Sequence, residues 1–447
     1  MSDKTISSPM SIPASRFARW ISCQPAWVLT IYAMTAAFVG YMSMYAFRKP
    51  FTATGYDSIE PITILGVAFG YKPIAVISQL LGYTCSKFLG IKFASEASLR
   101  ARVPAVLGLI CFAQIMLILF AITPAPYNLF FLFCNGLPLG MVWSMLFGIV
   151  EGRRITEFLG LGMSVSVIFS SGWVKGVGKW TMETWHVAEF WMPAVTGLLF
   201  VPVLLISMLM LWHTPPPTAE DIAQRTKRAP MDRQARRDFI RVYFPGVAML
   251  IVGYLCLMAY RNIRDDFMDK ILLQLGHPVT SSDFASIESY VGLVVIGLLC
   301  FLWFFKNNRH AVWANLTLVA LGALLLGIST IMLKAEMLGP VQFYILNGIG
   351  LYAAFVPYQS ILMDRLLASL PTVATATFLI ALGDSYGYLS VVATYLGRDI
   401  YQSFTQESLP WATLLMYASF TVMVVVPLTA VGCTIYFSKR MKNNGHP

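Results

Sequence analysis

Long apolar segments alternate with short polar stretches along the whole chain of 447 residues. Apolar runs of about 20 residues have the length of an α-helix that crosses a bilayer. A transmembrane β-barrel would show shorter segments of alternating hydrophobicity instead. The pattern predicts an all-α integral membrane protein with twelve transmembrane helices. The predicted spans are 26–48, 69–89, 103–122, 127–150, 159–178, 190–212, 244–261, 286–305, 311–333, 341–363, 373–396 and 411–437.

The longest hydrophilic stretch divides these spans into two sets of six. It covers residues 213–243 and is rich in Lys and Arg. The sequence therefore predicts an N-terminal segment, two six-helix bundles joined by a basic linker, and a C-terminal tail. The corresponding ranges are 1–25, 26–212, 213–243, 244–437 and 438–447.

Composition and charge agree with a membrane protein. Hydrophobic residues make up 57% and charged residues 12% of the chain, whereas soluble domains carry about 25% charged residues. The net charge of +10 does not require a nucleic-acid partner, because the basic residues lie at helix ends and in short loops. They concentrate on the cytoplasmic side if both termini are cytoplasmic, as the positive-inside rule requires. We expect a monomeric, multi-pass protein of a bacterial inner membrane, since we recognise no targeting segment and the loops are compact.

Polar residues recur at almost one spacing in the two sets of spans. The matching positions, 212 or 213 residues apart, are Asn135-Gly136 with Asn347-Gly348, Tyr41 with Tyr254, and Arg48 with Arg261. Each Tyr precedes its Arg by two helical turns, so the two side chains share a helix face. This repetition predicts duplicated halves, as in the parallel repeats of major facilitator transporters.

Arg48 and Arg261 are the first candidates for a substrate site. An arginine within the membrane costs about 2.5–3.5 kcal/mol on insertion scales, so a water-filled cavity, a carboxylate or an anionic substrate must offset it. The alternative is an arginine whose head group reaches the membrane interface. Matching positions in two repeats would place the arginines at the repeat interface, where transporter sites lie. Two guanidinium groups there would suit a doubly charged anion.

Tyr41, Tyr45 and Tyr254 share helix faces with these arginines and offer hydroxyl groups to the same ligand. The alternative for each is an aromatic belt at the membrane interface. Asp384 lies within the eleventh apolar run, beside Gly383. A carboxylate there is a proton site, the partner of a buried cation, or a structural hydrogen-bond acceptor between helices.

Two acidic and basic pairs occupy matching cytoplasmic helix ends. They are Glu151 with Arg153, and Asp364 with Arg365. We interpret them as gate salt bridges that stabilise one access state. Ordinary charges at helix ends are the alternative.

Asp265, Asp266 and Asp269 follow the second arginine. We expect a solvated helix end with local ion pairs to Arg264 and Lys270, and a divalent cation site is the alternative. Elsewhere, no His, Cys or acidic spacing suggests a metal site. No hydrolase or nucleotide-binding motif is present either. We therefore expect neither a cofactor nor an enzyme with catalytic residues.

Several of these residues occur in motifs that resemble the organophosphate:phosphate antiporters, the glycerol-3-phosphate and hexose-phosphate transporters of the major facilitator superfamily. The matching motifs are Tyr41-x3-Tyr45-x2-Arg48-Lys49-Pro50-Phe51, Gly82-Tyr83-x2-Ser86-Lys87-Phe88, Arg261 followed by Asp266, and Glu288 soon after Ser281-Ser282. The resemblance implies that the two arginines bind the phosphate of the substrate. It also implies that Lys49, Asp266 and Glu288 take part in ion pairs that rearrange during transport.

Two features depart from that family. Its fifth helix carries a His at the substrate site, whereas the span 159–178 has none and offers Ser170, Ser171 and, further along, Lys175. The loop after the second span lacks the usual Asp-Arg pair after Gly90. We therefore expect a divergent branch of the superfamily.

The sequence predicts a secondary active transporter, an antiporter of phosphate or an organophosphate by resemblance, that works by alternating access. Asp384 or Glu288 would couple protons, or a counter-anion such as phosphate would replace that role. One alternative is a transporter-like sensor, and another is a membrane-embedded enzyme acting on lipids. A third is a transporter of neutral or cationic solutes, in which Arg48 and Arg261 are paired to carboxylates such as Asp266 and Asp384.

Overall fold

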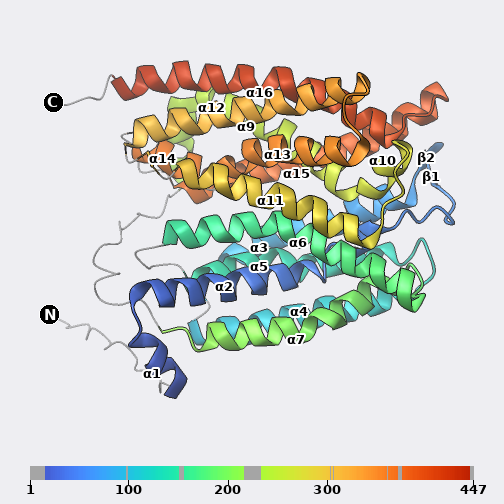
Figure 1. Ribbon diagram of the computed structural model, residues 1–447, viewed down its shortest axis with the longest axis horizontal. Helices are drawn as coiled ribbons and strands as arrows, with labels where there is room; N and C mark the ends of the chain where they lie inside the picture. Colours follow the sequence, from blue (N-terminus) through green and yellow to red (C-terminus); the bar gives the residue numbers. More distant parts are fainter. Residues whose placement is uncertain are drawn as a thin grey trace.

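A computed structural model describes the chain over 16–96, 99–150, 156–215, 233–302, 304–305, 307–359, 361–370 and 375–442. Within these ranges two groups of long helices lie side by side (Figure 1). The N-terminal half contains α2 (Ala26–Tyr45), α3 (Tyr71–Glu96), α4 (Leu99–Ile122), α5 (Leu129–Val150), α6 (Thr156–Trp185) and α7 (Met192–Trp212). The C-terminal half contains α9 (Arg233–Asp266), α11 (Ser281–Leu302), α12 (Asn308–Lys334), α13 (Pro340–Gln359) with α14 (Ile361–Ala368), α15 (Ala376–Thr405) and α16 (Trp411–Lys442).

The helices have the length and composition of membrane spans. Among the described residues, eight helices could cross a membrane, and α13 with α14, bent by 42°, would form a ninth. The long helices α3, α6 and α15 account for the remaining predicted spans. The all-α, multi-pass architecture with two pseudo-symmetric bundles is thus confirmed, and the predicted count of twelve is consistent with it.

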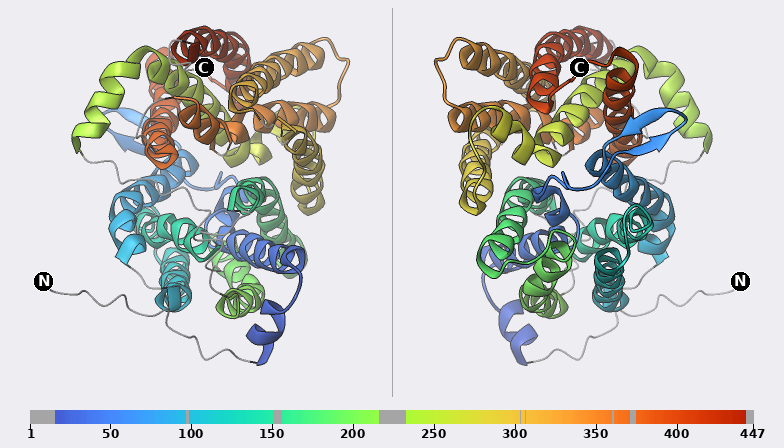
Figure 2. Two further views of the ribbon diagram at one scale, coloured as in Figure 1. Left: turned by 90° about the vertical axis from the view of Figure 1, so that its left-hand side faces the viewer. Right: turned by 90° about the vertical axis from the view of Figure 1, so that its right-hand side faces the viewer.

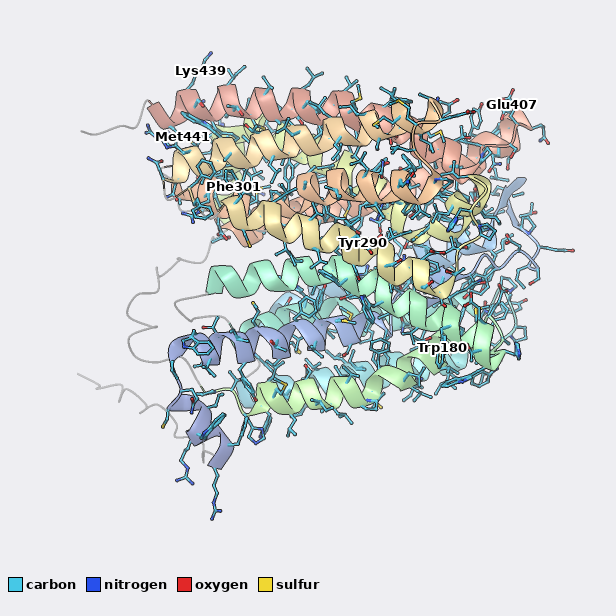
Figure 3. The ribbon with its side chains drawn as sticks, in the orientation of Figure 1. Trp180, Tyr290, Phe301, Glu407, Lys439 and Met441 are labelled. Atoms are coloured by element: carbon cyan, nitrogen blue, oxygen red, sulfur yellow. The ribbon has the colours of Figure 1, made fainter. Side chains whose placement is uncertain are left out.

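Short elements connect the long helices and distinguish the two ends of the molecule. They are α1 (Arg16–Ser22), η1 (Pro50–Ala53), α10 (Met268–Gln274), and the antiparallel strands β1 (Ile62–Ile64) and β2 (Val67–Phe69). We call the end with the β1–β2 hairpin, where Trp180 and Glu407 lie, the hairpin end (Figure 3). We call the opposite end, where α1 and Lys439 lie, the terminal end (Figures 1 and 3).

The seventh predicted span begins earlier than expected. Helix α9 starts at Arg233, inside the stretch predicted as linker, and has non-helical dihedrals at Tyr243 (φ −110°, ψ 15°) shortly before Pro245. Proline cannot donate a backbone hydrogen bond and clashes with the preceding turn, so it kinks a helix. The predicted start at residue 244 therefore marks this kink rather than a helix N-terminus.

The two halves approach most closely where α6 packs against α11. A Cβ atom on Gly172 would lie 2.3 Å from the carbonyl oxygen of Phe284, and one on Gly176 would lie 2.7 Å from that of Ser281. Both distances are too short for a real side chain, so these glycines allow the two backbones to touch. This contact fixes α6 beside the C-terminal half.

Candidate functional site

Arg48 lies in the turn that follows α2. Its backbone N–H donates to the carbonyl of Tyr45, the last residue of α2, at 3.0 Å. The side chain is only 8% exposed. Its guanidinium carbon lies 3.9 Å from the ring centroid of Tyr83 on α3 and 5.8 Å from that of Tyr45. Arg48 is therefore buried against aromatic faces.

Arg261 has a comparable environment near the end of α9. It is also 8% exposed, and its guanidinium carbon lies 5.1 Å from the ring centroid of Phe355 on α13. Tyr254, two turns earlier, stacks on the same Phe355 ring with centroids 5.5 Å apart. Each arginine thus lies against aromatic rings of its own half of the molecule.

The structure brings Arg48 and Arg261 to one site. Tyr45 and Tyr388 each lie near both guanidinium groups. Tyr388, on α15, is 5.8 Å from Tyr83, ring to ring. Tyr41 packs on Tyr45 with centroids 5.4 Å apart. We call Tyr41, Tyr45, Tyr83 and Tyr388 the tyrosine cluster.

Neither arginine forms an ion pair with a carboxylate in the part of the chain that the structure describes. The Nε atoms of both Arg48 and Arg261 are buried without a hydrogen-bond partner among those residues. A buried cation without a paired anion is costly. The site therefore carries positive charge that a bound anion would offset.

The nearby lysines, by contrast, are paired across the two halves. Lys49 Nζ lies 2.6 Å from Asp265 Oδ2 and 2.6 Å from Asp266 Oδ1. Lys175 Nζ on α6 lies 2.7 Å from Asp265 Oδ1. Tyr395 donates to the other oxygen of Asp266 at 2.9 Å. We call Lys49, Lys175, Asp265 and Asp266 the inter-half network.

Further pairs lie towards the hairpin end. Lys72 Nζ contacts Asp269 Oδ1 at 2.6 Å, and Lys270 Nζ contacts Asp57 Oδ1 at 2.6 Å. The expectation of a solvated helix end with local ion pairs is therefore wrong. The three aspartates after Arg261 pair with lysines of the N-terminal half, because the fold buries this helix end between the halves.

The hairpin itself joins the two halves. It reaches from the N-terminal half to α15 (Figure 2). The Gly70 N–H donates to Asp399 Oδ2 at 3.0 Å, and the Ala68 N–H donates to Ser403 Oγ at 3.1 Å.

Glu288 lies inside the C-terminal half rather than in the inter-half network. Its Oε1 accepts from Arg264 Nη1 at 2.6 Å, and Arg264 also donates to the carbonyl of Tyr344 at 3.0 Å. Both members of the Arg264–Glu288 pair are buried. Glu288 is thus held by Arg264, which the sequence analysis had placed in local ion pairs with the aspartates after Arg261.

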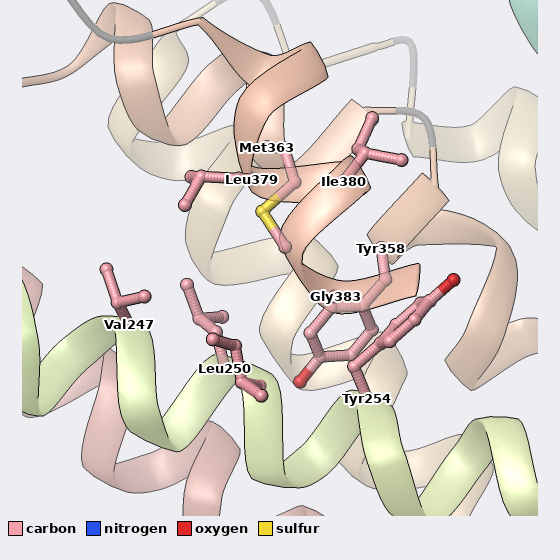
Figure 4. Close-up of a pocket in the computed structure, with 9 residues that line it drawn as sticks. Val247, Leu250, Tyr254, Tyr358, Met363, Leu379, Ile380 and Gly383 are labelled. Atoms are coloured by element: carbon pink, nitrogen blue, oxygen red, sulfur yellow. The ribbon is translucent and has the colours of Figure 1, made fainter. Parts of the chain in front are cut away.

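Asp384 on α15 is in contact with Tyr254 on α9, within the C-terminal half. The Tyr254 hydroxyl donates to Asp384 Oδ1 and accepts from Gln359 at 2.8 Å. Beside them, Tyr254 and Tyr358 border a small apolar cavity of about 10 Å³ (Figure 4). A cavity of that size holds about one water molecule, so it is no solute site.

A larger cavity of about 300 Å³ lies at the hairpin end. Its polar lining includes Thr54, Asp57, Lys179, Glu189 and Lys270. These residues come from the loop after η1, from α6 and the segment that follows it, and from α10. The cavity is therefore separate from the arginine site and shows polar space between the halves beyond the inter-half network.

The predicted gate residues are described only in part. Arg365 on α14 donates to Asn308 Oδ1 at 2.9 Å, and Asp364 lies on the same short helix. Glu151 and Arg153 lie outside the described residues. Their pairing stays a prediction.

The two repeated asparagines support matching parts of the site. Asn135 donates to the carbonyl of Phe47, the neighbour of Arg48, at 3.1 Å. Asn347 donates to the hydroxyl of Tyr260, the neighbour of Arg261, at 2.7 Å. Each asparagine therefore fixes the backbone or side chain next to the arginine of its own half.

Sequence reasoning missed several contributors to the site. Tyr83, Tyr388 and Phe355 received no role, Arg264 was expected to pair locally with the aspartates after Arg261, and Asp265 was expected at a solvated helix end. The available signal was a charged residue within an apolar helix, since such residues are rare and functional in membranes. The comparison with the antiporter motifs pointed to Lys175, but not to its partner.

A family model described as "Family of unknown function (DUF5690)" matches residues 50–440. No curated protein matches the chain. Among solved structures with a similar fold is a bacterial homologue of the human lysosomal transporter Spinster, in an inward-facing and unoccupied conformation. Its TM-score is 0.58 and its sequence identity is 11%, and the match covers 97% of this chain and 100% of that one. A mutant of the peptide transporter POT in complex with sulfate has a TM-score of 0.60, 14% identity, and coverage of 97% and 99%.

The xylose transporter XylE from E. coli, in a partially occluded inward-open conformation, has a TM-score of 0.56, 13% identity, and coverage of 92% of this chain and 97% of that one. Identities this low show the fold and not the activity. The fold is that of the major facilitator transporters. Since the family model covers most of the sequence, the chain belongs to the family of unknown function DUF5690.

Proposed function

We propose that this protein is a secondary active transporter that carries an anionic, phosphorylated small molecule by alternating access. The observation that carries the proposal is the pair of buried arginines, Arg48 and Arg261, which have no carboxylate partner among the described residues. Both guanidinium groups can grip phosphate oxygens through paired hydrogen bonds. Tyr41 and Tyr45 would add hydroxyl donors from the same face of α2.

The charge balance of the site supports a doubly charged ligand. In the inter-half network the two lysines are matched by the two aspartates. The two arginines are left over, so the site as a whole carries two uncompensated positive charges. A phosphomonoester dianion would neutralise them. The alternative of arginines in structural ion pairs is disfavoured, because Asp266 pairs with Lys49 and neither arginine pairs with a carboxylate among the described residues.

The ion pairs between the halves support an inward-facing state. They lie towards the hairpin end, which we place on the outer side of a bacterial inner membrane, with both termini cytoplasmic. Transport would require these pairs to break as the two six-helix halves rock. Two of the solved structures with this fold are described as inward-facing or inward-open.

We further propose that the protein works as a monomer. In the opposite state, the cytoplasmic side would be closed by the gate residues Glu151, Arg153, Asp364 and Arg365.

Ligand binding to the purified protein tests the proposal. We would follow the melting temperature with inorganic phosphate, glycerol 3-phosphate, glucose 6-phosphate and succinate, using wild type, Arg48→Gln and Arg261→Gln. A ligand that binds only the folded state raises the melting temperature as its concentration passes its Kd. We expect a phosphorylated compound to stabilise the wild type and neither variant.

Arg309→Gln is the matched control. Arg309 contacts Met441 at the terminal end, so its loss should leave the ligand response unchanged. The absence of any anion response in the wild type would reject the proposal, as would an equal response in all four proteins. Binding without uptake into proteoliposomes would favour a sensor instead.

A further inference from the structure

We propose that Lys175 sets the charge of the arginine site. By holding the Asp265 carboxylate, it keeps this anion off Arg261 and leaves both arginines available for a dianionic ligand. The inference rests on the proposed function, and it assigns a specificity-determining role to a residue of α6.

The sequence places Asp265 where it could neutralise Arg261. The two residues are four positions apart on α9, so they lie on adjacent turns of the same helix face. An oppositely charged pair at this spacing forms readily on a helix. The two side chains do interact electrostatically in the structure, yet they form no ion pair among the described contacts.

The lysines explain why this local pair does not form. Lys175 Nζ lies 2.7 Å from Asp265 Oδ1 and donates to the backbone carbonyl of Asp265 at 2.8 Å. The Ser171 hydroxyl, one turn earlier on α6, donates to the same Oδ1. Lys49 takes the other carboxylate oxygen at 2.6 Å. Each oxygen of Asp265 thus lies within ion-pair distance of a lysine of the N-terminal half.

The position of Lys175 is fixed by packing. Its side chain is fully buried, and the backbone of α6 on either side touches α11 at Gly172 and Gly176. A side chain held in this way is preorganised, so it need not pay ordering entropy when a ligand binds. Without its ammonium group, the inter-half network would carry one negative charge in excess. Asp265 would then turn to Arg261, and the site would favour a monoanion.

A charge-restoring variant tests this role. We would compare wild type, Lys175→Met, Lys175→Arg and the double variant Lys175→Met/Asp265→Asn, with inorganic phosphate and glycerol 3-phosphate as probes. We expect Lys175→Met to weaken binding of the dianionic probe at least tenfold. The double variant should recover affinity to within about threefold of wild type, because it removes the surplus carboxylate, and Lys175→Arg should bind like wild type. A double variant as weak as Lys175→Met would overturn the inference, since Lys175 would then act only through folding or closure.

A second measurement is independent of any ligand. Double-mutant cycles on the melting temperature, combining Arg261→Gln and Asp265→Asn, report the coupling between those two side chains. We expect the coupling to be larger in the Lys175→Met background than in wild type. An unchanged coupling would overturn the role of Lys175 even if anions bind. If the wild type binds no anion, the proposed function fails, and the cycles still decide whether Lys175 keeps Asp265 off Arg261.

Discussion

Lys49 of the N-terminal half and Asp266 of the C-terminal half form a buried ion pair, with Lys49 Nζ 2.6 Å from Asp266 Oδ1. Their side chains are 6% and 1% exposed. Removing one partner of a buried pair leaves an uncompensated charge and typically costs about 3–5 kcal/mol. Removing both charges together costs much less.

We therefore expect Lys49→Met and Asp266→Asn each to lower the melting temperature in detergent, and the double variant Lys49→Met/Asp266→Asn to recover part of that loss. Asp57→Asn is the control, because Asp57 is 79% exposed in its pair with Lys270 and exposed pairs contribute little. Strictly additive losses in the double variant would show that Lys49 and Asp266 do not depend on each other.

The hairpin offers a direct test of closure at its end of the molecule. Its Ala68 N–H donates to Ser403 Oγ on α15 at 3.1 Å. We expect Ala68→Cys combined with Ser403→Cys to form a disulfide under mild oxidation, in a background without the native cysteines. The cross-link should stop exchange of substrate in proteoliposomes, and a reductant should restore it, because rocking requires this contact to part.

Leu65→Cys with Ser403→Cys is the matched control for that cross-link. Leu65 is fully exposed at the tip of the hairpin, so this pair should cross-link poorly. Equal cross-linking of both pairs would mean that the hairpin has no fixed position on α15. Full exchange in the cross-linked Ala68 variant would mean that the hairpin end does not open.

Close packing of α3 on α5 positions Tyr83, whose ring lies against the guanidinium group of Arg48. A Cβ atom on Gly136 would lie 2.2 Å from the carbonyl oxygen of Gln79 and 2.8 Å from the backbone N of Tyr83. Since backbone atoms cannot move aside cheaply, Gly136→Ala should cost about 1–3 kcal/mol or more and displace Tyr83. We expect a lower melting temperature and weaker anion binding.

Gly108→Ala is the control for that substitution. Apart from its chain neighbours and the backbone of its own helix, no heavy atom of the described residues lies within 4 Å of the Cβ position of Gly108 on α4. Alanine also favours a helix over glycine by about 1 kcal/mol. The control should therefore be neutral or slightly stabilising. Equal melting temperatures for the two alanine variants would contradict the close contact between α3 and α5.

The helices could be predicted from the sequence because apolar runs of membrane length leave few alternatives. The matching positions of Arg48 and Arg261 could also be found, because a duplicated chain repeats its spacing. The strands β1 and β2 could not, since three residues each are too short for a periodic pattern. The partner of Lys175 could not be found either, because Asp265 lies 90 residues away in the other half and a local pair was the simpler expectation.

The two carboxylates considered for coupling differ in their partners, and this difference separates their roles. Glu288 is paired with the buried Arg264 at 2.6 Å, so Glu288→Gln should leave a buried charge and lower the melting temperature strongly.

Asp384 accepts from the Tyr254 hydroxyl, a neutral donor, and asparagine keeps an acceptor oxygen at that position. We therefore expect Asp384→Asn to fold normally and bind the phosphorylated ligand. If Asp384 carries the coupling proton, this variant should lose accumulation driven by a pH gradient while it keeps exchange of substrate across proteoliposomes. Accumulation at the wild-type rate in Asp384→Asn would exclude that role and leave a counter-anion as the coupling species.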